Sequence, residues 1–243
     1  MNQNYKIYPL GDAAACIDLG NIIDEEINKK IIAIREWLQS NSFEGLKDII
    51  IAYSSISVYY DPIILKKKLH LHSTVFEFIS QKLEIAFQQA IVTDEMDKKI
   101  IQIPVCYSNE FGIDIDFISQ EKNISKEEII HLHTSKIYRV YMIGFLPGFS
   151  YLGKLDEKIA LPRKPKPVTI AAGSVGIAGM QTGIYPLVSP GGWQIIGRTP
   201  MKSFDPNATM PVIMNAGDYI KFYEISKDEF ENYKVTNKSE IEE

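Results

Sequence analysis

This chain of 243 residues has only two cysteines and four histidines, and its acidic residues outnumber its basic residues. The two cysteines, Cys16 and Cys106, lie far apart in apolar, strand-like runs, which predicts two buried thiols rather than a disulfide or a metal site. The formal net charge of −5 argues against a nucleic-acid partner, because such a partner needs a basic surface.

Long apolar runs are also missing. None approaches the roughly 18 residues that a membrane-spanning helix needs, and no basic segment precedes an apolar one at the N-terminus. We therefore expect no membrane partner and a cytoplasmic location. The hydrophobic content of 45% and the charged content of 23% are typical of a globular protein with a real core.

Familiar nucleotide and nucleophile motifs are absent. The glycine-rich stretch 173–179 lacks the Lys-Ser/Thr ending of a phosphate-binding P-loop and the strand-turn-helix context of a dinucleotide site. Around Ser174 there is no G-x-S-x-G pattern, which disfavours a serine nucleophile. This chain alone does not resemble an ATPase, the sequence leaves open which subunit of a complex would bind ATP, and the glycines have a structural interpretation as turn residues.

The four histidines form two His-x-His pairs, His70/His72 and His131/His133. Residues two apart on a helix point about 200° apart, so neither pair converges on one metal ion, and no metal site is expected. His133 is a candidate acid/base residue because it lies just before the aromatic segment 138–149. The alternative for all four is an ordinary surface or core histidine.

The first hundred residues predict a compact α/β unit. Strand candidates at 5–10 and 13–19 are joined by a Gly-Asp turn, and two more follow at 47–53 and 56–60. Helical spacing of apolar residues follows each strand pair, after Asp24 and after Asp61-Pro62. This order predicts a ferredoxin-like sandwich with helices on one side of an antiparallel sheet.

The rest of the chain changes character after a polar linker at 93–99. A strand is expected at 99–107, a capping box at Ser125 opens a short helix, and a last strand follows at 219–225. Between them, short β-rich runs punctuated by glycine and proline favour a β-barrel or sandwich. We expect an α+β protein with domains at 1–95 and 96–230 and a charged tail at 231–243.

Residues 144–200 concentrate glycine, proline and aromatic residues, a composition typical of shaped loops on a rigid scaffold. Arg163 and Arg198 stand beside prolines there, and a guanidinium fork suits a carboxylate, bicarbonate or phosphate. The alternative for each arginine is a structural brace. Backbone N–H groups at Gly173 and Ser174 are candidates for an anion-binding nest. The remaining candidates for substrate binding are Phe145, Gln181, Thr182, Tyr185, Gly191, Gly192 and Trp193.

Five segments, taken in order, resemble the family of the 5-oxoprolinase B-type subunits, which also includes the kinase inhibitor KipI and allophanate hydrolase subunit 1. They are GFLPGFSYLG at 144–153, LPRK at 161–164, AGSVGIAGMQTGIYP at 172–186, SPGGWQIIGRTP at 189–200 and AGD at 216–218. Two positions depart from the usual pattern, since Pro167-Val168 replaces a second Pro-Arg and Ala171 replaces a proline.

The resemblance implies a ferredoxin-like N-terminal domain and a cyclophilin-like C-terminal β-barrel. It implies partner subunits of the A and C types, and a small carboxylated substrate, 5-oxoproline, opened to glutamate with ATP used at the level of the complex. Two other functions remain open. One is a subunit that handles allophanate or urea, and the other is an inhibitor of a sensor histidine kinase that docks through Phe145, Phe149 and Trp193.

Overall fold

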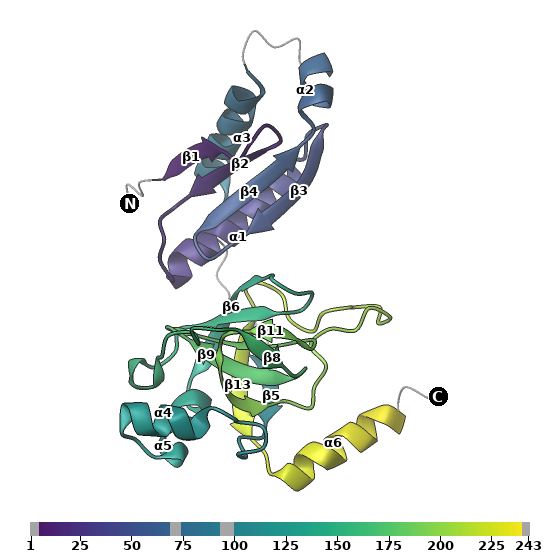
Figure 1. Cartoon of the computed structure of the whole chain (residues 1–243). Helices are drawn as coiled ribbons and strands as arrows, with labels where there is room; N and C mark the ends of the chain where they lie inside the picture. Colours follow the sequence, from purple (N-terminus) through teal and green to yellow (C-terminus); the bar gives the residue numbers. More distant parts are fainter. Residues whose placement is uncertain (1–4, 69–73, 93–99, 240–243) are drawn as a thin grey trace. The chain divides into compact units, whose positions relative to one another are not determined.

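The chain divides into two compact units, Met1–Met96 and Asp97–Glu243. The computed structural model describes residues 5–68, 74–92 and 100–239, and Figure 1 draws both units. His70, His72 and the linker predicted at 93–99 lie outside the described residues.

The first unit is one antiparallel sheet with its long helices on one face, as Figure 1 shows. The strand order is β1-β2-β4-β3, and α1 and α3 pack against each other and against the sheet. The ferredoxin-like assignment stays a prediction. The elements are β1 (Lys6–Pro9), β2 (Ala14–Asp18), α1 (Glu25–Ser40), β3 (Leu46–Ile51), β4 (Ser55–Tyr60), α2 (Pro62–Lys68) and α3 (Val75–Gln89).

Local capping fixes where these helices begin. The Asp24 carboxylate accepts a hydrogen bond from the N–H of Ile27, and Asp61 accepts from Ile63 and Ile64 ahead of α2, as the sequence predicted. The sequence analysis missed the capping box that Thr74 and Glu77 form at the start of α3.

The second unit is built around a curled seven-stranded sheet. Its strand order is β12-β9-β10-β7-β6-β13-β5, and a separate pair, β11 and β8, forms a small second sheet. The strands are β5 (Ile100–Val105), β6 (Ile137–Ile143), β7 (Ser150–Gly153), β8 (Val168–Ile170), β9 (Ser174–Ala178), β10 (Gln181–Ile184), β11 (Ser189–Gly191), β12 (Gln194–Arg198) and β13 (Tyr219–Glu224). The helices are α4 (Ile115–Lys122), α5 (Lys126–Thr134), the short 3-10 helix η1 (Glu157–Ile159) and α6 (Lys227–Ser239), which includes most of the segment expected as a charged tail.

The two edge strands of the curled sheet meet at one end. Cys106, just after β5, and Arg198, the last residue of β12, exchange two backbone hydrogen bonds of 2.9 and 3.0 Å. Cys106 and Cys16 are both buried free thiols, which confirms the interpretation of the cysteines. Curling brings β12 beside the start of the unit, so loops far apart in the sequence meet along this strand.

Alternation along the strands places different residues on the two faces of the curled sheet. Val175 and Ile177 of β9 and Ile184 of β10 point into the main core, which also receives Tyr138 and Phe222. The opposite face, here called the outer face, carries a smaller cluster of Phe149, Ile170, Ala178, Tyr185, Trp193 and Ile195. The candidate functional site lies on this outer face.

Candidate functional site

A pair of glycines makes room for aromatic rings on the outer face. Gly176 of β9 and Gly183 of β10 are direct partners in the antiparallel register. A Cβ on Gly176 would lie 3.1 Å from Cβ of Trp193, and one on Gly183 would lie 3.0 Å from the Trp193 ring and 2.7 Å from the carbonyl oxygen of Ser150. The Trp193 indole therefore lies in a trough that only paired glycines provide.

Phe149 is the centre of the aromatic cluster. Its ring makes edge contacts with Tyr185 at 5.0 Å and with Trp193 at 5.4 Å between centroids, and a tilted contact with Tyr151 at 4.8 Å. Such edge-to-face geometry is favourable for aromatic pairs. Gly191 completes the packing, because a Cβ there would lie 2.5 Å from the Tyr185 hydroxyl oxygen. These contacts make a rigid aromatic wall.

The wall borders a pocket of about 320 Å³. The volume is near the lower end of the roughly 300–1,000 Å³ usual for small-molecule sites. From the predicted set, the lining residues are Phe145, Arg163, Tyr185, Gly191, Gly192 and Trp193. The sequence analysis did not propose the other lining residues as substrate contacts, and these are Phe149, Tyr151, Pro167 and Pro190.

Arg163 supplies the positive charge of this pocket. Its guanidinium carbon lies 6.0 Å from the centroid of the Trp193 ring, and the described residues hold no ion pair to it. The loop that carries it is fixed at two points: the N–H of Lys164 donates to the carbonyl of Gly192 at 2.6 Å, and the Gln194 amide donates to the carbonyl of Pro162 at 3.1 Å. The backbone on both sides of Arg163 is therefore fixed, and the charge of its guanidinium is available to a ligand.

Two phenols share the pocket with this arginine. Burial raises the pKa of Tyr151, and the charge of Arg163 opposes that shift. Burial likewise raises the pKa of Tyr185, opposed by a backbone hydrogen bond from Trp193 and by Arg163. Both hydroxyls are therefore protonated near neutral pH and able to donate hydrogen bonds. An anion with a flat apolar body fits this combination of a cation, hydroxyl donors and aromatic walls.

Phe145 lies at the mouth of the pocket in a strained conformation. It belongs to the β6–β7 loop, closed by hydrogen bonds between Gly144 and Phe149 and between Phe149 and Leu146. Its φ of 71° is left-handed, which costs about 1 kcal/mol or more for a residue with a Cβ, and its side chain is 62% exposed. Of the three aromatic anchors expected for a kinase, only Phe145 is exposed, since Phe149 and Trp193 are buried.

Arg198 does not share the pocket with Arg163. It ends β12, whereas Trp193 directly precedes that strand, so the two positions are about 16 Å apart along the backbone. The Arg198 guanidinium lies 4.9 Å from the centroid of the Phe111 ring, and its Nε is buried without a hydrogen-bond partner among the described residues. The expectation of one site with two arginines is not supported by this arrangement.

The predicted anion nest has no free donor. The N–H of Gly173 donates to the carbonyl of Tyr185 at 2.7 Å, and the N–H of Ser174 donates to that of Ala171 at 3.3 Å. Gly173 has φ of 79°, and a Cβ there would lie 2.5 Å from the Thr199 carbonyl oxygen. These two residues form a tight turn, the structural alternative considered from the sequence.

His133 and Thr182 lie in the main core. His133 is fully buried, its Nδ1 is 2.7 Å from the Tyr107 hydroxyl, and its Nε2 is 2.9 Å from Oγ1 of Thr182. Because Thr182 donates its own proton to the carbonyl of Gly176, it accepts from Nε2–H, and Nδ1 accepts from Tyr107. Both ring nitrogens are hydrogen-bonded, and neither residue is a lining residue of the aromatic pocket. The acid/base role of His133 and the substrate contact of Thr182 stay predictions from the sequence.

Burial lowers the pKa of His133 from 6.5 to about 3, which predicts an acid-labile core. The folded state holds the ring neutral, whereas the unfolded chain takes up a proton below pH 6.5. The stabilisation is therefore complete above pH 6.5 and is lost as the pH falls toward 3. Between pH 7 and pH 5 this residue should remove about 2 kcal/mol of unfolding free energy.

Urea unfolding of Trp37→Phe protein, followed by Trp193 fluorescence at both pH values, measures this loss. His133→Gln should abolish that share of the pH dependence. His131→Gln is the matched control, because His131 is exposed on the same helix. An unchanged pH dependence in His133→Gln would contradict the assignment.

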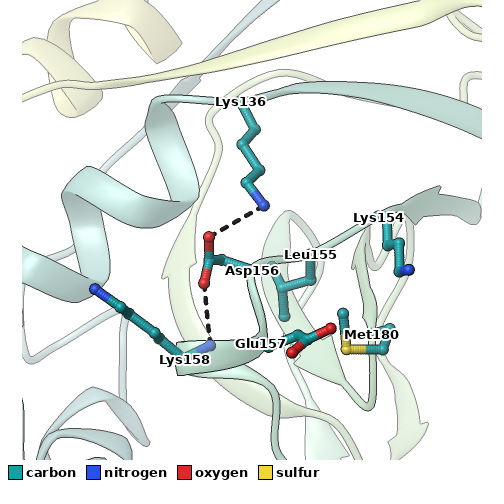
Figure 2. Close-up of a pocket in the computed structure, with 7 residues that line it drawn as sticks. All are labelled: Lys136, Lys154, Leu155, Asp156, Glu157, Lys158 and Met180. Atoms are coloured by element: carbon teal, nitrogen blue, oxygen red, sulfur yellow. Dashed lines mark hydrogen bonds and ion pairs between the residues drawn. The ribbon is translucent and has the colours of Figure 1, made fainter.

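A second hollow of about 450 Å³ lies near η1, away from the aromatic wall, and Figure 2 shows it. The Asp156 carboxylate there is 3.1 Å from Nζ of Lys136 and accepts from the N–H of Lys158 at 3.0 Å. The bond from the backbone of Lys158 and the contact with Lys136 lower the pKa of Asp156, which is therefore ionised near neutral pH. Three lysines and two acidic residues line this hollow, and none of its described lining residues is aromatic. Gln181, partly buried beside Met180 of this hollow, is not a lining residue of the aromatic pocket.

Residues 5–68, 74–92 and 100–239 contain no cluster of three or more His, Cys, Asp or Glu side chains arranged to hold a metal ion. Over the same ranges, every helix is too short or too polar to cross a bilayer.

The chain matches the family model "Carboxyltransferase domain, subdomain C and D" over residues 5–214. The chain belongs to this carboxyltransferase family. It is 41% identical to the B-type subunit of 5-oxoprolinase from Bacillus subtilis over 96% of this chain and 98% of that protein. It is 36% identical to the corresponding 5-oxoprolinase subunit of Haemophilus influenzae over 89% of this chain and 96% of that protein.

A solved member of similar fold is TTHA0988, which is 31% identical with a TM-score of 0.74. The similarity covers 88% of this chain but only 40% of TTHA0988, so this carboxyltransferase-family chain spans less than half of that protein. The family model extends over both the aromatic wall and the Arg163 loop.

Sequence reasoning on this family member missed Tyr151, although a signal for it exists. In the segment SYLG the serine and leucine are buried in the core, and alternation places Tyr151 on the other face of β7. Pro167 and Pro190 carry no such signal, because their positions depend on the pairing of β8 with β11.

Proposed function

We propose that this chain is the B-type subunit of an ATP-dependent 5-oxoprolinase, and that the aromatic pocket binds the substrate's carboxylate. The relationship to the Bacillus subtilis protein extends over nearly the whole of both chains. The observation that carries the site assignment is the position of Arg163. Its guanidinium has no ion-pair partner among the described residues and lies beside a wall of aromatic rings.

The chemistry of 5-oxoproline matches this pocket. The molecule is a small five-membered lactam ring with one carboxylate. The guanidinium of Arg163 forms a bidentate pair with the carboxylate, and the lactam ring lies against Trp193. The Tyr185 hydroxyl donates a hydrogen bond to an oxygen of the ligand. These contacts bind and orient the lactam, while ATP is used at the level of the complex with partners of the A and C types.

The finer fold assignments belong to the same proposal. We infer a ferredoxin-like first domain, at 1–95, and a cyclophilin-like second domain, at 96–230. The pairing of Cys106 with Arg198, which joins the edges of the curled sheet, supports a barrel for the second. Two of the three anchors expected for a histidine kinase, Phe149 and Trp193, are buried, which disfavours kinase inhibition through this face.

Glutamate release from 5-oxoproline tests the function directly. The chain alone should be inactive, and a mixture with its A-type and C-type partners and ATP should release glutamate. ADP formation in the mixture should depend on 5-oxoproline. An inactive mixture of folded proteins would contradict the proposal, and hydrolysis of allophanate by the same mixture would identify the urea-related function instead.

A further inference from the structure

Asp114 occupies the N-cap position of α4 without capping the helix. Aspartate at this position usually accepts a hydrogen bond from the first turn, but no such bond is present here. Its carboxylate instead accepts from the N–H of Ile195 at 2.7 Å, and its own N–H donates to the carbonyl of Ile195 at 2.9 Å. The residue is therefore tied to β12 by two bonds and is turned away from its own helix.

The same carboxylate binds Lys164, the neighbour of Arg163. The two atoms, Oδ2 of Asp114 and Nζ of Lys164, are 2.6 Å apart, and the side chains are only 16% and 17% exposed. Partial burial weakens screening by water and salt, so this ion pair is stronger than the exposed pairs of the surface. Together with the backbone bond from Lys164 to Gly192, it fixes the arginine loop at adjacent points of the pocket rim.

We propose that Asp114 is a positioning residue: through Lys164 it holds Arg163 over the aromatic pocket and so sets the affinity for the substrate's carboxylate. This inference rests on the proposed function of the pocket. Asp114 also neutralises Lys164, which would otherwise present a competing cation to the ligand one residue away from Arg163. The site thus combines a lysine whose ion pair anchors the loop with an arginine that forms no ion pair within residues 5–68, 74–92 and 100–239 and that binds the ligand.

Neither Asp114 nor Lys164 is a lining residue of the pocket. Removal of either charge should therefore displace Arg163 without removing a contact with the ligand. In Asp114→Asn the amide oxygen still accepts from Ile195, but the charge that holds Lys164 is lost. In Lys164→Met the side chain keeps a similar length and an apolar stem, but the charge that pairs with Asp114 is lost. We expect each variant of the assembled complex to show about a tenfold higher KM for 5-oxoproline, with kcat within about twofold of the wild type.

The double variant and a rescue distinguish positioning from general damage. If the two residues act through each other, the KM of Asp114→Asn/Lys164→Met should be no higher than that of either single variant. Lys164→Arg, which keeps the ion pair, should restore a KM close to that of the wild type. Asp116→Asn is the matched control on the same helix, since Asp116 pairs with Lys126 instead, and it should leave KM unchanged.

Three results would overturn the proposal. Additive effects of the two substitutions would show that they act separately, and a lower kcat at unchanged KM would show damage to another step. An unchanged KM in both single variants, when Arg163→Ala raises it, would show that the loop needs no anchor. If Arg163→Ala also leaves KM unchanged, the assignment of the pocket itself fails. Thermal unfolding of each variant confirms that the compared proteins are folded.

Discussion

Replacement of Arg163 by alanine should raise the KM of the assembled complex for 5-oxoproline about 100-fold, which is the loss of affinity expected when a bidentate guanidinium–carboxylate pair is removed. Arg163 is exposed and its guanidinium forms no ion pair among the described residues, so the substitution should not unfold the protein. Arg163→Lys should recover only part of the affinity, since lysine keeps the charge but loses the planar fork. Steady-state glutamate release over a range of 5-oxoproline concentrations measures these values.

Lys166→Ala is the control for charge alone. Lys166 is exposed on the same loop but is not a lining residue of the pocket, so its removal should change KM less than twofold. Arg198→Ala distinguishes the roles of the two arginines. We expect it to leave KM unchanged, because Arg198 lies at the end of β12 that is farther from Trp193 and the pocket. A large rise in KM for Arg198→Ala with none for Arg163→Ala would reverse the assignment.

Gly183→Ala should destabilise the second unit by about 3 kcal/mol, the cost of forcing a methyl group into a closed space. The new Cβ would lie 2.7 Å from a backbone oxygen of Ser150, which is fixed by the pairing of β10 with β7. The other contacts are the rings of Trp193 and Phe149, which are held by the rest of the cluster. No flexible side chain is available to move.

Urea unfolding of Trp37→Phe protein measures this effect, because Trp193 is then the sole tryptophan. Gly144→Ala is the matched control: a Cβ there meets only the flexible end of Met142, at 3.4 Å. That control should stay within about 0.5 kcal/mol of its parent. A Gly183→Ala protein as stable as the Gly144→Ala protein would show that the outer-face trough is not tightly packed.

Local sequence signals predicted much of the fold. The caps at Asp24 and Asp61, the buried cysteines and the change to short strands after residue 138 are all read from neighbouring residues, and the structure confirms them. The order of the seven strands has no comparable signal, because it depends on pairings between distant segments such as β13 with β5.

The candidate site was predicted in part, and the reason is geometric. Phe149, Tyr151 and Trp193 line the pocket because the paired glycines Gly176 and Gly183 leave room for aromatic rings on the outer face. His133, Thr182 and Arg198 carry suitable chemistry but lie elsewhere, since strand alternation and helix orientation decide which face each one occupies. Asp114 is about fifty positions from Arg163 and carries no sequence signal of its ion pair with Lys164.

Fluorine NMR of the bound complex tests most directly whether the aromatic pocket holds the substrate. Growth of this chain with 5-fluorotryptophan labels only Trp37 in the first unit and Trp193 in the pocket, and the partner proteins stay unlabelled. On addition of 5-oxoproline to the assembled complex, the Trp193 resonance should shift in a saturable manner while that of Trp37 stays in place, and Arg163→Ala should weaken the response. An unmoved Trp193 resonance in a complex that turns over 5-oxoproline would contradict the account.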